Sequence, residues 1–176
     1  MANLNINTPL QGSYVYVNKP HTGFDGKEKY QLDLLIPETL TEVINQIEAA
    51  EQAAIQEGLT KVFNGKAPSK SSLKSVLKDG NEKEDSVYHG CRYITATSKV
   101  KPKLVGSDPT IPLGDDEIIV GGDYICVSLN LKAYNVGGQK GVTAYIQAVQ
   151  LVKKGEPFGK KDPTKDFVAH NNEEFI

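Results

Sequence analysis

The chain has 176 residues, of which 39% are hydrophobic and 24% are charged, and its formal net charge is −2. This length suits one domain with a single core, and no apolar run approaches the roughly 18 residues that a membrane span needs. The first residues lack the basic and apolar regions of an export signal, and the two cysteines have no partners at metal-binding spacing. We therefore expect no membrane partner, no metal and no cofactor.

The charge is unevenly distributed along the chain. Residues 90–161 contain ten basic and six acidic residues, which is a local charge of +4, whereas residues 162–176 carry −3. Local charge, rather than net charge, attracts a polyanion. A net charge of −2 is therefore compatible with nucleic-acid binding.

Two strands are expected near the N-terminus. Residues 13–18 alternate between apolar and aromatic side chains, which predicts a strand with Tyr14 and Tyr16 pointing outward. Residues 29–36 form a second alternating segment, and Pro37 ends it because proline cannot donate to a strand ladder.

The spacing of apolar residues then changes to that of a helix. Thr39 and Glu42 fit a capping box at its start, and Gly58 is placed to end it. Most of its acidic residues fall on the outer side, which is typical of a solvated helix face. Residues 60–90 show no periodicity and are expected to be irregular.

The next strand is expected over residues 92–100. At its end and directly after it, Lys99, Lys101 and Lys103 occupy alternate positions of one extended segment, which indicates a row of cations along a phosphate backbone. The alternative is that these lysines only protect a sheet edge from pairing.

A long β-hairpin dominates the second half of the chain. Residues 123–135 and 142–152 both alternate, and a glycine-rich break joins them. The outward side chains include Lys132, Tyr134 and Tyr145. Aromatic rings and cations on one sheet face are typical of proteins that bind single-stranded nucleic acid, because bases stack on the rings.

The order of these elements predicts a mainly β fold with one α-helix packed on it (α+β). We expect an OB-fold, a five-stranded Greek-key antiparallel barrel with a long hairpin. This domain should span residues 1–157, and residues 158–176 should form an acidic, flexible C-terminal tail.

The tail ends in residues that suit contact with a partner. Glu173 and Glu174 precede Phe175 and Ile176, so the tip joins acidic and large apolar side chains. Such a tip suits a basic-rimmed apolar site on another protein, and the acids suit the chain's own cationic face until DNA displaces them. The alternative is an ordinary frayed terminus.

The sequence contains no motif typical of a catalytic site. His21, His89 and His170 lie in unrelated contexts, and no nucleophile motif or HExxH motif occurs. The glycine-rich break joins two strands, whereas a phosphate loop precedes a helix. We expect no enzyme and no catalytic residue.

Several segments resemble a family of tailed-bacteriophage single-stranded DNA-binding proteins with an OB-type core, many first described as a domain of unknown function. The resemblance rests on the order and spacing of several segments. The first is the strand over residues 29–37 with the helix that follows it, and the later ones are Leu77–Asn81, Ser98–Lys103, Ala133–Asn135 with Gly141, and Val149–Glu156. It implies sequence-independent binding of single strands during phage DNA replication or recombination, in the cytoplasm of the infected bacterial host. It also implies that the tail contacts phage or host replication proteins, although its acidic block is thinner than in bacterial counterparts.

The predicted DNA-binding residues are rings and cations of the predicted strands. The candidate stacking residues are Tyr14, Tyr16, Tyr93, Tyr134 and Tyr145. The candidate phosphate contacts are Lys99, Lys101, Lys103, Lys132, Lys140 and Arg92. Arg92 ranks last, because it should point to the opposite side of its strand from Tyr93.

Two alternatives remain open at this point. A phage structural or assembly protein would use the same sheet for protein contacts, and an RNA-binding chaperone would use it for RNA. Stacking and phosphate contacts do not distinguish the sugars. The pattern also leaves open whether the chain forms a homo-oligomer.

Overall fold

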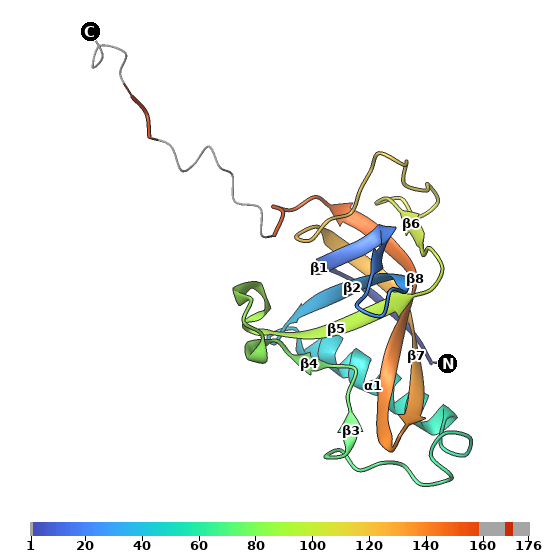
Figure 1. Ribbon diagram of the computed structural model, residues 1–176. Coiled ribbons are helices and arrows are strands. Elements are labelled where there is room, and N and C mark those ends of the chain that lie inside the picture. The colour runs from blue at the N-terminus through green and yellow to red at the C-terminus, as the bar shows by residue number, and fades with distance from the viewer. Residues whose placement is uncertain (1, 159–167, 171–176) are drawn as a thin grey trace.

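The computed structural model describes residues 2–158 and 168–170 (Figure 1). Its elements follow in this order: β1 Ala2–Thr22, β2 Glu28–Pro37, α1 Thr41–Glu57, β3 Leu73–Lys74, β4 Lys78–Asp79, the 3₁₀ turns η1 Gly80–Glu82 and η2 Ser86–Tyr88, β5 Cys91–Ser98, β6 Lys103–Val105, β7 Tyr124–Val136 and β8 Gln139–Lys153. Among the described residues, no helix is long and apolar enough to cross a membrane.

Strands β1, β2, β5, β8 and β7 close into a barrel in that order. Four of the five pairings are antiparallel, and the closing pair of β5 with β8 is parallel, with Ala96 opposite Ala144. An odd number of strands cannot alternate in direction all the way round, so one parallel pair is unavoidable. The predicted OB-type fold, mainly β with one helix, is confirmed.

The barrel core is built from the inward side chains of its strands. Leu32, Leu34, Ile94 and Leu129 are fully buried there, as expected for apolar residues at alternate positions. Helix α1 packs across β1 and β7 at one end of the barrel (Figure 1).

The helix starts later than its predicted cap. It begins at Thr41, and Leu40 occupies the N-cap without a side-chain hydrogen bond, so the capping box at Thr39 is wrong. Gly58 does end the helix. Glu51 also departs from the predicted solvated side, since it is buried and accepts a 2.8 Å hydrogen bond from Ser75 Oγ. Burial raises the pKa of its carboxyl group.

Strand β1 is much longer than predicted. It starts at Ala2 instead of residue 13, and its N-terminal half pairs with β7 from Ala2 opposite Leu131. The region 60–90 likewise holds short elements: β3 runs parallel to the start of β8, and β4 pairs with β5. These short strands extend the sheet next to the start of β8 and the start of β5.

Candidate nucleic-acid interface

One row of side chains crosses all five strands on the outside of the barrel. Tyr16 pairs with Gln31, Gln31 with Thr97, Thr97 with Tyr145, and Tyr145 with Asn130. Paired residues share a face, so the two tyrosines stand on one continuous surface, three strand steps or about 14 Å apart. We call this surface, with the neighbouring outward residues of the same strands, the aromatic face.

The first ring of this row is held by a second ring. Tyr16 stacks on His21, with 4.4 Å between ring centroids and 22° between planes. Tyr14, two residues earlier, is 51% exposed and has a positive φ of 46° at an irregularity of the β1 ladder. A left-handed backbone is unfavourable for a bulky residue by about 1–3 kcal/mol, so surrounding contacts hold Tyr14 in place.

A buried hydrogen-bonded cluster lies beneath Tyr14. Asp33, on β2, accepts hydrogen bonds from the hydroxyl groups of Tyr88 and Thr95. Tyr88 is fully buried, and its ring lies 6.4 Å from that of Tyr14. Burial, reinforced by the bond to Asp33, raises the pKa of Tyr88 far above its usual range. The hydroxyl therefore stays a donor to the carboxylate.

Tyr93 belongs to the same cluster. The rings of Tyr88 and Tyr93 pack edge to face, with 5.1 Å between their centroids. The ammonium groups of Lys78 and Lys83 lie 5.7 and 5.5 Å from the Tyr93 centroid. Lys83 also lies 5.2 Å from the centroid of Tyr88. These are cation–π distances. The structure thus adds two cations to this part of the face that sequence reasoning missed, because residues 78–90 carry no periodic pattern.

The β7–β8 side of the face carries Tyr134, Tyr145 and Lys132. Tyr134 is half-buried, and a Cβ atom at Gly141 would lie only 2.5 Å from its hydroxyl oxygen, so the absence of a side chain at 141 makes room for the ring. Tyr145 is 39% exposed. A cavity of about 290 Å³ is lined by Tyr134 of β7 and by Thr95 of β5, two residues after Tyr93.

The predicted phosphate contacts divide into two groups. Lys99, Lys101 and Lys132 are exposed. Lys101 lines a cavity of about 480 Å³ together with Tyr16 and Lys19, and the latter is a further cation that sequence reasoning missed. Lys103 is exposed on β6, opposite Ala148 of β8. The predicted row of three lysines therefore leaves the strand after Ser98 and turns along the barrel.

Two of the predicted cations lie apart from the tyrosines. Lys140 pairs with Asn135, whose amide donates to the carbonyl of Val62 after the helix, so it lies on the other side of the hairpin from Tyr134. Arg92 pairs with Ile36 and donates to the carbonyl of Leu77, and its Nε atom is buried. This inward position agrees with its low rank.

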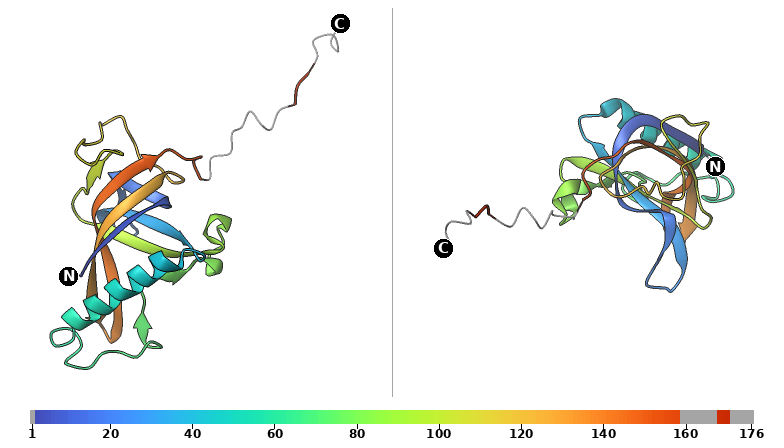
Figure 2. Two further views of the ribbon diagram at one scale, coloured as in Figure 1. Left: turned by 180° about the vertical axis from the view of Figure 1, so that it is seen from behind. Right: turned by 90° about the horizontal axis from the view of Figure 1, so that it is seen from above.

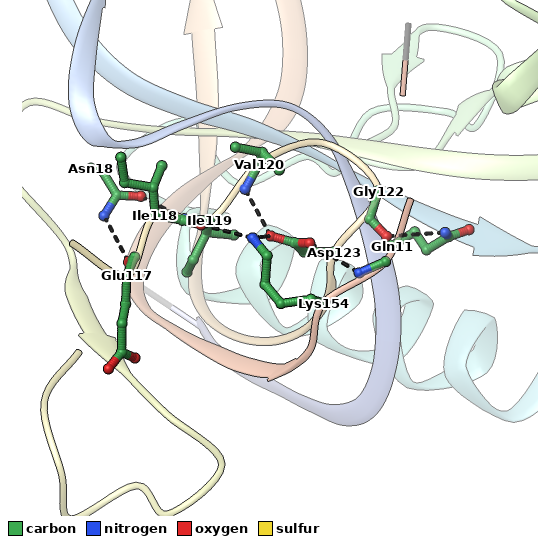
Figure 3. A network of polar contacts seen from close by, with 10 residues as sticks. Gln11, Asn18, Glu117, Ile118, Ile119, Val120, Gly122, Asp123 and Lys154 are labelled. Atoms are coloured by element: carbon green, nitrogen blue, oxygen red, sulfur yellow. Dashed lines mark hydrogen bonds and ion pairs between the residues drawn. The ribbon is translucent and has the colours of Figure 1, made fainter. Parts of the chain in front are cut away.

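The last described core residues are anchored beside Tyr14 and Tyr16. The fully buried Asp123 accepts hydrogen bonds from Lys154 Nζ and from the backbone N–H groups of Val120 and Gly155 (Figure 3). Phe158 then donates its N–H to the carbonyl of Gly121. Pro157 and Phe158 line a cavity with both tyrosines, so the described core ends next to the aromatic face.

The remaining expectations concern the partner contacts of the tail and a metal site. The predicted partner contacts Glu173, Glu174, Phe175 and Ile176 lie outside the described residues. Within the described part of the chain, no group of three or more His, Cys, Asp or Glu residues is arranged to hold a metal ion.

Comparison with known proteins finds similar sequences and similar folds. A putative protein p50 of Acyrthosiphon pisum secondary endosymbiont phage 1 is 28% identical over 138 residues, which cover 76% of this chain and 73% of the relative. The single-stranded DNA-binding protein of bacteriophage Enc34, solved in complex with single-stranded DNA, has a similar structure with a TM-score of 0.74, 22% identity and 90% coverage of both chains.

A second solved structure shares the fold at lower identity. The single-stranded DNA-binding protein gp2.5 of bacteriophage T7 matches with a TM-score of 0.62 and 18% identity, over 97% of this chain and 96% of that one. The model of the family described as Enterobacter phage Enc34 ssDNA-binding protein matches residues 5–176. That family is defined by binding and not by catalysis, and this chain belongs to it.

Proposed function

We propose that this chain binds single-stranded DNA without sequence preference on its aromatic face. The observation that carries the proposal is the row from Tyr16 to Tyr145, because it sets two outward-pointing rings on one surface with exposed lysines beside them. The membership of the chain in a family of phage single-stranded DNA-binding proteins supports it.

In this proposal, bases stack on the tyrosines and phosphates lie near the lysines. Tyr14 and Tyr145 are the exposed rings of the five candidates, whereas Tyr16, Tyr93 and Tyr134 are half-buried. Each stacked base contributes about 1–3 kcal/mol, so two or three engaged rings suffice for useful binding. Lys99, Lys101 and Lys132 are the principal phosphate contacts, with Lys103 further along the barrel.

Membership in the family supports a proposal about the biological setting. We propose a role in phage DNA replication or recombination, in the cytoplasm of the infected bacterial host, where exposed single strands need protection. Partner contacts of Phe175 and Ile176 with phage or host replication proteins belong to the same proposal.

The decisive experiment is a gel shift with poly-dT, duplex DNA and RNA at two salt concentrations. We expect poly-dT to bind more tightly than the duplex, with a logarithmic salt slope of about −0.7 for each phosphate neutralised. Absence of salt-sensitive binding together with self-assembly of the chain would favour a structural role. Preference for RNA over poly-dT would favour an RNA chaperone.

The acidic tail is proposed to compete with DNA for the aromatic face. Its described start, at Pro157 and Phe158, already lies beside Tyr14 and Tyr16, and the residues from Asp162 onward carry −3. Deleting residues 162–176 should therefore tighten binding to poly-dT at low salt, and high salt should abolish the difference. Unchanged or weaker binding after the deletion would refute self-masking.

A further inference from the structure

An exposed phenylalanine stands at the tip of the β1–β2 hairpin. Phe24 is fully exposed, and the hairpin that carries it projects away from the barrel (Figure 2, right). The tip faces solvent, so no core contact accounts for an aromatic ring there. Large apolar side chains exposed in this way often mark an interaction site.

The turn that carries this ring is well ordered by its own hydrogen bonds. Gly23 N–H donates to the carbonyl of Lys27, Gly26 N–H donates to the carbonyl of Gly23, and Lys27 N–H donates to Asp25 Oδ1. Gly26 has a φ of 75°, which favours glycine. The turn therefore presents Phe24 outward in a preformed position, which lowers the entropic cost of binding.

The hairpin also connects the tip with the aromatic face. His21 pairs with Lys29 just below the turn, and it stacks on Tyr16, the first ring of the row across the barrel. Strand β1 is irregular here: from Tyr16, opposite Gln31, to Thr22, opposite Glu28, strand β2 advances only three residues. At about 3.3 Å per strand residue, the turn therefore begins about 10 Å beyond that row. A strand bound at Tyr16 thus has rings leading outward along β1.

The charges around the tip suit an anionic ligand only moderately. Lys19, Lys27 and Lys29 are exposed, and Asp25 and Glu28 reduce the formal charge of residues 19–29 to +1. One oxygen of Asp25 is already engaged by the turn. The ring, more than the charge, is therefore the distinctive chemistry of this hairpin.

We propose that Phe24 is a second stacking station, which binds the open face of a nucleobase at the end of a strand held on the aromatic face. This inference rests on the proposed function and extends it by one residue and one surface. The base face comes either from an unpaired nucleotide or from the last base pair of a duplex with a single-stranded overhang, and both present the same π surface.

Affinity measurements on matched variants test this contact. Phe24→Ala should weaken binding of an oligo-dT of about 16 nucleotides by about 5- to 100-fold, and leave binding of one of about 4 nucleotides unchanged, since only the longer one reaches the tip. Phe24→Leu should lose nearly as much, and Phe24→Tyr should retain wild-type affinity. All three should melt at the wild-type temperature because the side chain is exposed.

Two outcomes would overturn the inference. One is an equal affinity of wild type and Phe24→Ala for the longer oligomer, and the other is wild-type affinity of Phe24→Leu for it.

Fluorescence adds a direct readout, because the chain has no tryptophan. In Phe24→Trp, the fluorescence of the single indole should be quenched by oligo-dT, by a duplex with an overhang, or by both. The ligand that quenches it shows whether the stacked base is an unpaired nucleotide or belongs to the last base pair of a duplex. Ile111→Trp, at an exposed position of the loop after β6, is the control and should not be quenched. If wild type binds oligo-dT and Phe24→Trp is not quenched by either ligand, this inference fails alone. If wild type does not bind, the proposed function fails.

Discussion

The two sides of the aromatic face differ in how their tyrosines are held. On the β1–β2–β5 side, Tyr14 and Tyr93 contact the buried Tyr88, whose hydroxyl group bonds to Asp33. On the β7–β8 side, Tyr145 projects from the hairpin with no ring partner among the described residues. A ring that serves the fold and a ring that only serves a ligand should respond differently to substitution.

The largest expected effect is on stability, at the centre of the β1–β2–β5 side. Tyr88→Ala should lower the free energy of unfolding by about 3–5 kcal/mol, because it removes a fully buried ring and leaves Asp33 with fewer donors. Tyr145→Ala, the matched exposed substitution, should change it by no more than about 0.5 kcal/mol. Urea unfolding of both variants measures the difference, and similar losses would contradict the comparison.

For DNA affinity the order of the two sides reverses. Tyr145→Ala should weaken poly-dT binding by about 1–3 kcal/mol while the protein stays as stable as wild type. Tyr93→Ala should reduce both affinity and stability, because its ring packs against Tyr88.

The choice of oligonucleotide sharpens this test. Tyr134→Ala and Tyr145→Ala should weaken binding to all base sequences alike, since every base has a π face. Titrations with dT, dC and mixed oligomers measure this. A loss confined to one sequence would rule out the stacking account.

A pH series isolates the buried hydroxyl group of Tyr88. Since its pKa is raised above the usual value of about 10, the folded state holds the proton more tightly than the unfolded state does. This contribution is complete below about pH 10 and is lost as the pH rises further, at up to about 1.4 kcal/mol per pH unit. Tyr88→Phe should lack that part of the decline when unfolding is measured between pH 9 and 11, relative to its own stability at pH 8. Parallel curves for the two proteins would contradict it.

The smallest expected effect distinguishes two lysines of one hairpin. Lys132 pairs with Thr143 on the outward side, and Lys140 pairs with Asn135 on the other side. Lys132→Gln should make the salt slope of poly-dT binding shallower by about 0.7, whereas Lys140→Gln should leave it unchanged. Equal changes would mean that the DNA also passes along the far side of the hairpin.

Much of this fold follows from local pattern in the chain. The alternation over 29–36 and over the long hairpin, and the change of period at residue 40, correctly predict β2, β7, β8 and α1. The early part of β1 was missed because Asn3, Asn5 and Asn7 disfavour strands in isolation. Pairing with β7 makes that segment a strand regardless of its local preference.

The candidate site was less predictable than the fold. The two-residue period placed Tyr16 and Tyr145 on the outward side of their strands and Arg92 on the opposite side from Tyr93, as the structure has them. Which of these residues bind DNA stays a prediction. Parity could not identify Tyr88, Lys78 or Lys83, because they belong to an irregular segment that reaches the face only after folding. Phe24 was likewise part of a loop with no pattern to mark it.

The sequence by itself determined most of the long strands and which of their side chains point outward, because that information lies in a two-residue period. The tertiary structure alone decided that Tyr16 of β1 and Tyr145 of β8 share one row, since this depends on barrel closure through the parallel contact between β5 and β8. It also decided which rings are held and which are free. Both outcomes depend on contacts between residues far apart in the chain, which no local period records.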